Sequence, residues 1–400
     1  MIPSVRQAYN AAFTPSHYAR LGAAVAGACG EAPTFRLAET PIFLPDYLAR
    51  DLLRAADAIS ERLADPEVLA ATSAAIREPY WSVPGEPGRP LFLQYDFAIC
   101  RDGDGRLSPS LIELQGFPSL YFFQAELARA FRQNTPVPAG FRSFFGGHDE
   151  GSYLQRLREA IIGEHDPEQV ILLEIEPRTQ NTRIDFRATH NLIRLPTVAL
   201  EDLRREGRRL SYVDADGREI EVRRIYNRVI LDELLGKRIN DYAYSLREEV
   251  DVEWAGHPDW FLRISKHTLP ALHALPGVPE TLYLTDYLPG SRALEDYVLK
   301  PLYSFSGAGV NLHPTEADIA AVARPRNWIL QRRAAYEPVL ETPTGPAKCE
   351  VRMMLLWREG TERAECVNTL VRITKGEMTG VKYNRDKDWV GASVAFHRLG

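Results

Sequence analysis

The sequence predicts a mixed protein of the α+β and α/β classes, with a helical N-terminal region, a small open α/β unit and a strand-rich remainder. Apolar side chains recur at helical spacing before residue 80, helix-like and strand-like segments alternate between about 152 and 250, and strand-like runs dominate from about 255 onward. Because 400 residues exceed what one hydrophobic core usually spans, we expect two or three packed subregions.

Composition and charge exclude several classes of protein. Hydrophobic residues make up 45% of the chain and charged residues 26%, as in an ordinary globular protein. A formal net charge of −6 argues against a broad nucleic-acid surface, which needs clustered Lys and Arg. The basic run at 204–209 fits the solvated end of a helix. The four cysteines are too widely spaced for a CxxC metal or redox pair. We therefore expect no nucleic-acid partner.

Signals for membrane insertion or secretion are also missing from the sequence. The apolar stretch at 21–30 is too short to span a bilayer, and residues 1–13 lack the apolar core of a signal peptide. We expect a cytoplasmic protein without a membrane partner.

Residues 1–88 are expected to form the helical N-terminal region. Within 45–72, apolar residues such as Leu48, Leu52 and Ile59 recur at helical spacing. A cluster of Pro and Gly at 79–90 then interrupts the pattern and marks a boundary.

Residues 89–150 are expected to form two paired strands and a short helix. The strands cover 90–100 and 107–117, on either side of a DGDG turn. A helical pattern follows at 124–133, and a run rich in Pro, Gly and Phe closes the unit.

Residues 151–250 are expected to form the small open α/β unit. An amphipathic helix at 153–163 precedes a continuous apolar strand at 170–177, of the kind buried in a parallel sheet. The segment 198–207 is helix-like, and Asp216-Gly217 predicts a hairpin turn.

Residues 251–400 are expected to form a nucleotide-binding unit made mainly of strands. The unit begins with a helical segment at 265–275. The strands are predicted at 296–302, 307–313, 328–333, 349–357, 365–373 and 390–397.

The stretch YVLKPLYSFSGAGVNLH contains a lysine at the end of an apolar run, followed by a loop of small residues. The loop residues are Ser304, Phe305, Ser306, Gly307, Ala308 and Gly309. The stretch is not a Walker A loop, because that motif places its lysine after the glycines. Lys300 on a strand could instead face a polyphosphate while the loop folds over it with backbone N–H donors. The alternative is a plain hairpin turn beside a lysine.

A second lysine strengthens the phosphate interpretation. Lys266 begins the helical segment upstream of the loop, and two ammonium groups suit the large charge of a triphosphate. Gln331 ends a predicted strand and is a candidate hinge, where backbone groups could meet the edge of an adenine.

Carboxylates for Mg²⁺ are available on the strand pair in 89–150. Asp96 and Glu113 lie on the two paired strands, and Gln115 shares a face with Glu113 because side chains alternate along a strand. Mg²⁺ prefers hard oxygen ligands, commonly one or two carboxylates together with substrate phosphates. A carboxylate inside an apolar strand needs a partner, so a structural salt bridge is the alternative.

Together these motifs resemble the ATP-grasp superfamily, and specifically the circularly permuted, glutathionylspermidine-synthase-like amide ligases. Asp96 followed by Glu113-Leu114-Gln115 is similar to the family's metal-binding Asp and Glu-x-Asn. Lys266 in SKHTLP, and Lys300-Pro301-Leu302 before SFSGAGV, are similar to the family's two nucleotide lysines. In that group the carboxylate strands precede the lysines, as they do here.

The resemblance implies an ATP- and Mg²⁺-dependent carboxylate–amine ligase that forms an amide through an acyl phosphate. The late arginine of the family is most similar to Arg372, expected to stabilise charge at the reacting centre. Two residues depart from the pattern. Gln115 replaces the usual Asn, and Gln94 stands where a relative has a catalytic arginine. We expect Arg352 or Arg372 to substitute for that arginine.

The substrates implied are a small-molecule or peptide acid and an amine, and the oligomeric state stays open between monomer and homodimer. Arg228, at the end of a strand in the α/β unit, fits either a bidentate grip on a substrate carboxylate or a structural ion pair. Two other functions also fit the sequence, an ATP-dependent phosphotransferase and a catalytically inactive nucleotide-binding module.

Overall fold

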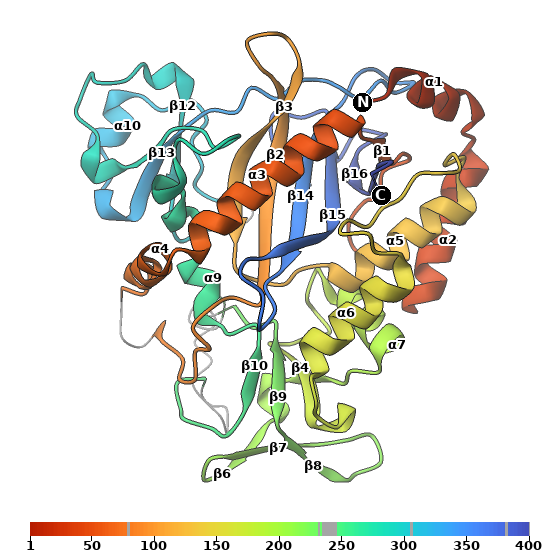
Figure 1. Cartoon of the computed structure of the whole chain (residues 1–400), viewed down its shortest axis with the longest axis vertical. Helices are drawn as coiled ribbons and strands as arrows, with labels where there is room; N and C mark the ends of the chain where they lie inside the picture. Colours follow the sequence, from red (N-terminus) through yellow and green to blue (C-terminus); the bar gives the residue numbers. More distant parts are fainter. Residues whose placement is uncertain (78–80, 231–232, 234–245, 305–306, 381–382, 400) are drawn as a thin grey trace.

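A five-stranded antiparallel sheet forms the centre of the computed structural model, which describes residues 1–77, 81–230, 233, 246–304, 307–380 and 383–399 (Figure 1). The strand order is β16-β15-β14-β2-β3. The bounds are β2 Phe92–Arg101, β3 Leu107–Gln115, β14 Lys348–Leu356, β15 Glu365–Thr374 and β16 Gly391–Ser393. The strand pair predicted at 90–117 is thereby confirmed, and its partner strands come from the last quarter of the chain.

The helices predicted before residue 80 are confirmed. They are α1 Pro3–Ala12, α2 Pro15–Cys29, α3 Asp46–Ala64 and α4 Pro66–Ala71, followed by the 3-10 helix η1 Thr72–Ala75. Helix α3 crosses one face of the central sheet (Figure 1), and its Leu48, Leu52 and Ile59 share a core with Tyr95 and Phe97 of β2. Because strand side chains alternate, Gln94 and Asp96 point to the opposite face.

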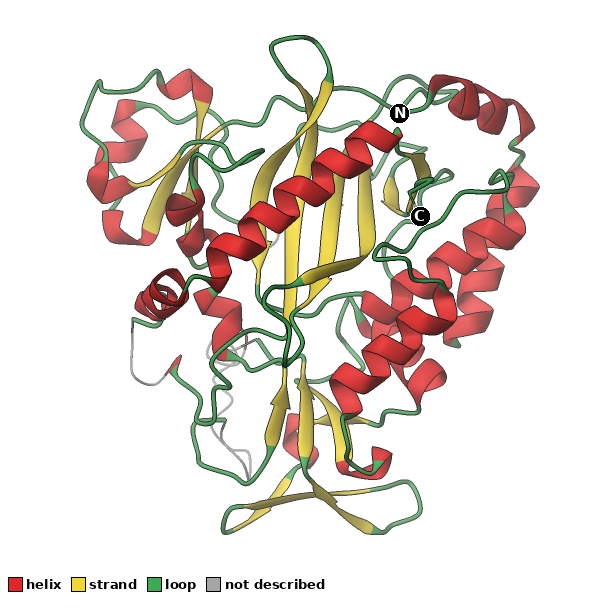
Figure 2. Ribbon diagram, viewed as in Figure 1, coloured by secondary structure: helices red, strands yellow, loops and turns green. Residues whose placement is uncertain are grey.

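The opposite face of the sheet is covered in part by α5 Tyr121–Asn134. Its aromatic side chains share a core with Phe92, Met354 and Leu370. Figure 2 shows α5 grouped with α2, α6 (Glu150–Ile162) and α7 (Arg183–Ile193) on one side of the sheet. Two short strands, β1 Ile42–Phe43 and β17 Ala395–Phe396, pair in parallel and join the N-terminal region to the end of the chain.

The small α/β unit contains a parallel sheet in the order β10-β9-β4-β5, as the apolar strand at 170–177 predicted. Its strands are β4 Val170–Glu174, β5 Thr197–Ala199, β9 Arg224–Asn227 and β10 Glu253–Ala255. An antiparallel sheet β6-β7-β8 extends from it, with β6 Arg204–Glu206, β7 Arg209–Val213 and β8 Glu219–Val222.

The helix predicted at 198–207 is wrong, and so is the helix end predicted for the basic run 204–209. This segment forms β5, the 3-10 turn η4 Leu200–Asp202 and the β6–β7 hairpin. Pairing of Val198 and Ala199 with β4 outweighs the local helical pattern, because strand formation depends strongly on the neighbours available. The hairpin at Asp216-Gly217 is confirmed between β7 and β8.

A three-stranded sheet, β11-β13-β12, lies on the other side of β3 from β2 (Figure 1). Its strands are β11 Thr281–Tyr283, β12 Tyr297–Pro301 and β13 Trp328–Arg332, with the short helix α10 Glu316–Ala320 beside them. The strand predicted at 307–313 is wrong, since only a single bridge joins Asn311 to Leu299.

The segment predicted as helical at 265–275 is a 3-10 helix, η5 Lys266–Leu272, rather than an α-helix. Pro270 lies inside it and lacks the N–H that an α-helical turn requires. The short helix α9 Asp259–Arg263 precedes it. Within the described ranges, no helix combines the length and apolarity needed to cross a membrane.

The end of β3 packs directly on α9 and the residues before η5. The backbone N–H of Gly116 donates to the carbonyl of Ile264 over 2.9 Å. A Cβ at residue 116 would lie 2.6 Å from the Trp260 carbonyl oxygen and 2.9 Å from Ile264 Cβ. Only glycine therefore permits this approach, which positions Lys266 beside β3.

We predict that Gly116→Ala lowers the free energy of unfolding by about 1–3 kcal/mol, because backbone rather than a flexible side chain would have to move. The matched control is Gly27→Ala on the exposed face of α2, where nothing lies within 4 Å of a new Cβ. There the change should stabilise the protein by about 0.5–1 kcal/mol. Urea denaturation measures both, and equal effects would contradict the packing described.

Candidate functional site

A cavity of about 750 Å³ lies between the three-stranded sheet and the β3 side of the central sheet. Six of the polar residues that line it come from six different elements. They are Glu113 on β3, Lys266 on η5, Lys300 on β12, Gln331 on β13, Glu350 on β14 and Arg372 on β15. Five of these six were predicted from the sequence, and the fold brings them to one place.

Lys300 is buried and lines this cavity. Its Nζ donates to the carbonyl of Ile112 over 3.0 Å and to the side-chain oxygen of Gln331. The Ile112 carbonyl is available because a β-bulge makes Ile112 an extra residue between the pairs Asp96–Glu113 and Phe97–Leu111. Gln331, for which a backbone contact to an adenine was predicted, thus contributes to the site through its side chain, which orients Lys300.

Burial lowers the pKa of Lys300 to about 8, although the nearby Glu113 carboxylate acts in the opposite direction. Burial also lowers the pKa of Lys266, and Glu113 again opposes the shift. The two ammonium groups also act on each other, because the charge of Lys266 lowers the pKa of Lys300 further. The arrangement favours an anionic ligand.

The loop after Lys300 begins at a well-anchored residue. The Tyr303 hydroxyl donates to the Ala75 carbonyl over 2.8 Å and accepts from Arg77 Nε over 2.8 Å. Lys266 Nζ donates to the Ser304 carbonyl, so this lysine contacts the base of the loop, while Lys300 lies on the strand that leads into it.

The part of the loop that lines the cavity contains Gly307 and Ala308. Gly307 and Gly309 both have positive φ, at 72° and 71°, which glycine adopts without strain. Of the predicted loop residues, Phe305 and Ser306 lie outside the described part of the chain.

Glu113 is the predicted carboxylate that faces the cavity. Among the described residues its carboxylate has no hydrogen bond or ion pair, while both lysines sense its charge. A half-buried carboxylate beside two lysines suits Mg²⁺ bound to a nucleotide, because Mg²⁺ takes few protein ligands and completes its shell with phosphate oxygens. The donor set therefore fits a magnesium–nucleotide complex, although the described residues include no cluster of three or more His, Cys, Asp or Glu.

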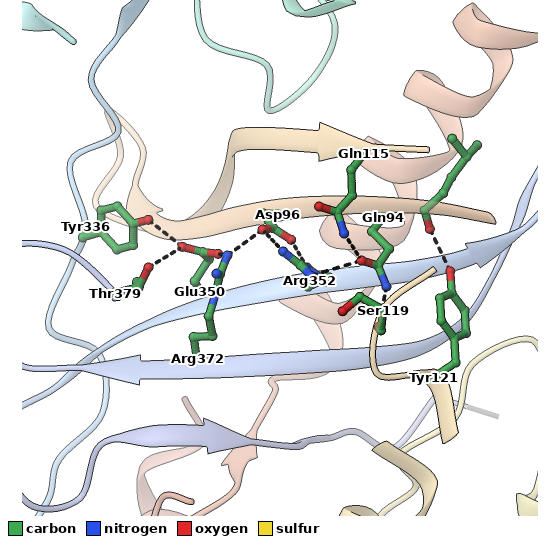
Figure 3. A network of polar contacts seen from close by, with 11 residues as sticks. Gln94, Asp96, Gln115, Ser119, Tyr121, Tyr336, Glu350, Arg352, Arg372 and Thr379 are labelled. Atoms are coloured by element: carbon green, nitrogen blue, oxygen red, sulfur yellow. Dashed lines mark hydrogen bonds and ion pairs between the residues drawn. The ribbon is translucent and has the colours of Figure 1, made fainter. Parts of the chain in front are cut away.

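Asp96 lies instead inside a network of charged side chains on the central sheet (Figure 3). Arg352 binds both of its oxygens, with Nε–Oδ1 at 2.5 Å and Nη2–Oδ2 at 2.6 Å, and Arg372 Nη2 lies 2.6 Å from Oδ2. Burial by itself raises the pKa of Asp96, but the two guanidinium groups outweigh it and hold the pKa below its ordinary value.

Glu350 is the site residue that the sequence reasoning missed. It accepts from Arg372 Nη2, from the Tyr336 hydroxyl over 3.0 Å and from Thr379 Oγ1 over 3.3 Å (Figure 3). Burial raises its pKa, and Arg372 acts against that shift. A glutamate inside the apolar run CEVRMMLLW was the signal, of the same kind that drew attention to Glu113.

Gln115 and Gln94 form an amide pair away from the cavity lining (Figure 3). Gln115 Nε2 donates to Gln94 Oε1, and Gln94 Nε2 donates to the Ser119 carbonyl over 2.7 Å. Arg352 Nη1 also donates to Gln94 Oε1 over 3.1 Å. Arg352 thus reaches the position where an arginine was expected, but it is buried and does not line the cavity.

Comparisons with known proteins give a fold but no family. No family model and no curated protein matches the sequence. Among solved structures, a glutathione synthetase-like effector from Globodera pallida, in its apo form, matches with a TM-score of 0.61 and 11% identity over 96% of each chain. At this identity the likeness shows a shared fold alone, over nearly the whole length of both chains.

A protein from Methylobacillus flagellatus KT, described as a "putative gamma-glutamylcysteine synthetase", matches with a TM-score of 0.41 and 12% identity. This match covers 87% of our chain and 88% of that one, and its TM-score is too low to support an argument.

Arg228 is not part of the cavity lining and lies in a buried ion pair. Its Nη1 is 3.3 Å from Asp185 Oδ2, and its guanidinium lies over the rings of Phe117 and Phe186. Asp185 also accepts from backbone N–H groups at the start of α5. This geometry matches the structural alternative for Arg228.

We predict that Arg228→Met lowers the free energy of unfolding by about 3–5 kcal/mol, because it leaves the Asp185 charge buried without its cation. Nucleotide affinity should stay unchanged. Arg223→Met, which removes an exposed arginine paired with Glu221, is the control and should cost about 1 kcal/mol or less. Urea denaturation and calorimetric titration with ATP measure the two properties. A loss of ATP affinity in a folded Arg228→Met protein would contradict this and support a role for Arg228 in ligand binding.

Proposed function

We propose that the protein is an ATP- and Mg²⁺-dependent carboxylate–amine ligase of the ATP-grasp type, which forms an amide through an acyl phosphate. The observation that carries the proposal is the convergence of Lys266, Lys300, Glu113 and Arg372 on one cavity. Phosphoryl transfer to a carboxylate needs cations around the triphosphate and a cation at the reacting centre, and this set supplies both.

The same proposal includes the order of the site motifs along the chain, which is that of the circularly permuted, glutathionylspermidine-synthase-like ligases. The Glu113 strand precedes both lysines in sequence, yet the Ile112 carbonyl accepts a hydrogen bond from Lys300. The fold shared with a glutathione synthetase-like protein supports an assignment to ligases of this kind. The substrates proposed are a small-molecule or peptide acid and an amine.

Each cavity residue has a role in this proposal. Lys266 and Lys300 neutralise the triphosphate, and the described loop residues Gly307 and Ala308, which line the cavity, supply backbone N–H donors to it. Arg372 stabilises the charge that develops on the transferring phosphoryl group or the tetrahedral centre. Glu113 holds Mg²⁺, which when bound screens the phosphate charge that repels an attacking carboxylate.

Two other functions remain as alternatives. A phosphotransferase would use the same nucleotide site and release a stable phosphorylated product. An inactive nucleotide-binding module is favoured by a specific observation, the amide pair of Gln94 and Gln115 at positions where the ligase family that the sequence resembles has an arginine and an asparagine.

Hydroxylamine separates these functions without knowledge of the natural amine. With Mg²⁺, ATP and a pool of candidate acids, the ligase should form a hydroxamate together with ADP and phosphate in equal amounts, because hydroxylamine displaces phosphate from the acyl phosphate. A kinase instead gives ADP and a phosphorylated acceptor that is stable to hydroxylamine. ATP binding without turnover across the pools would support the inactive module.

We predict that Lys300→Ala weakens ATP binding by at least about tenfold, because a buried cation facing the phosphates is lost. Glu113→Ala should retain most of the ATP affinity but abolish Mg²⁺-dependent hydroxamate formation. Arg54→Ala, which removes an exposed cation on α3, is the control and should change neither property. Calorimetric titration and the hydroxamate assay measure them. Unchanged ATP affinity in a folded Lys300→Ala protein would remove the nucleotide assignment.

We also predict that ATP affinity falls as the pH rises above about 8, the pKa of Lys300 in the free protein. The protonated lysine binds the triphosphate, and bound phosphates raise its pKa again, so binding near this pH should take up about half a proton. Titrations in buffers of different ionisation enthalpy measure the uptake. The Lys300→Ala protein should lose this uptake, and a wild-type affinity that stays flat from pH 7 to 9.5 would contradict the role of Lys300.

A further inference from the structure

We propose that Asp96 is a positioning residue and not a metal ligand. Together with Glu350 it fixes the guanidinium of Arg372 at the wall of the cavity, and Glu113 is the carboxylate that faces the metal. This inference rests on the proposed function and assigns the carboxylates of its site.

The first argument is that arginines already occupy both oxygens of Asp96. Oδ1 accepts from Arg352 Nε, and Oδ2 accepts from Arg352 Nη2 and Arg372 Nη2, all within 2.6 Å. The side chain is 1% exposed and is not part of the cavity lining. A cation could reach Asp96 only by breaking charge-assisted hydrogen bonds in a buried site, where they are strongest.

The second argument is the charge around each carboxylate. Asp96 has two guanidinium groups at hydrogen-bond distance, so a divalent cation beside it would meet strong repulsion. Glu113 has no ion pair among the described residues and lines the cavity. A metal held by Glu113 can take its remaining ligands from phosphate and water.

The third argument is the geometry of Arg372. Its partners come from two neighbouring strands, because Glu350 is its register partner on β14 and Asp96 lies one strand further. Both carboxylates bind the same nitrogen, Nη2, while the Arg372 side chain is 34% exposed and lines the cavity. Nη2 of the guanidinium is thus fixed by the two carboxylates and Nε is buried, while the side chain as a whole keeps an exposed surface at the cavity. Tyr336 and Thr379 in turn orient Glu350 (Figure 3).

Manganese binding separates a metal ligand from a positioning residue. We would titrate Mn²⁺, a paramagnetic substitute for Mg²⁺, into the protein saturated with the non-hydrolysable ATP analogue AMP-PNP and follow free Mn²⁺ by EPR. The matched variants are Asp96→Asn and Glu113→Gln, which each remove one negative charge with little change in volume. Glu113→Gln should weaken Mn²⁺ binding by at least about tenfold, whereas Asp96→Asn should change it by less than about threefold.

The same variants should differ in turnover. Asp96→Asn should lower kcat for hydroxamate formation by about 10²–10³-fold with little change in KM for ATP, because a misplaced Arg372 loses transition-state charge stabilisation. Glu350→Gln should show the same pattern, since it releases the same guanidinium nitrogen. If Asp96 and Glu350 had a purely structural role, the two substitutions would lower the free energy of unfolding but would not lower kcat selectively over KM.

Asp96→Asn leaves Arg352 buried without a carboxylate and could misfold for that reason. A second variant controls for this effect. Asp96→Asn with Arg352→Gln removes both charges of the pair and should fold, retain Mn²⁺ binding and keep the low kcat. If wild type binds Mn²⁺–AMP-PNP and both Asp96 variants lose it as Glu113→Gln does, the inference is wrong while the proposed function stands. If wild type binds no Mn²⁺–AMP-PNP, the proposed function fails and the carboxylate assignment fails with it.

Discussion

The need to pair every charge on the buried face of the central sheet constrains the rest of the structure. Asp96, Arg352, Arg372 and Glu350 lie on three adjacent strands, and all but Arg372 are almost completely buried. Each carboxylate binds a guanidinium, so two positive and two negative charges balance within the sheet. Removing one member would leave its partner as an unpaired charge in an apolar environment. This usually costs more folding free energy than the pair itself contributes. The register of β2, β14 and β15 is therefore tied to these contacts.

From this sheet the cavity is built by segments that are distant in sequence. The bulge at Ile112 turns a backbone carbonyl toward Lys300, and Gly116 lets β3 approach the residues before Lys266 closely. Tyr303 anchors the start of the loop on residues 75–77 of the N-terminal region. The helical region at the start of the chain thus supports the start of the loop after Lys300 as well as covering one face of the sheet.

Much of the fold could be predicted from local patterns, and the errors have a common cause. Helix α3 has apolar residues at helical spacing, β4 is a continuous apolar run, and β2 and β3 lie on either side of a turn signal, and all four form as predicted. The segment 198–207 has a helical pattern but lies beside β4, where pairing decides its conformation. Residues 307–313 have a strand-like composition, yet Gly307 and Gly309 turn the backbone instead. Local propensity was overridden where a neighbouring strand or a turn set the backbone.

The sequence by itself determined which residues are unusual enough to form a site. Lysines and carboxylates inside apolar strands must be compensated, so Lys300, Asp96 and Glu113 could be selected without a structure. Only the tertiary structure decided how each is compensated. Two arginines from β14 and β15 bind Asp96, whereas Glu113 stays open to the cavity. Strand order and register across hundreds of residues set that difference, and no local pattern in the sequence encodes it.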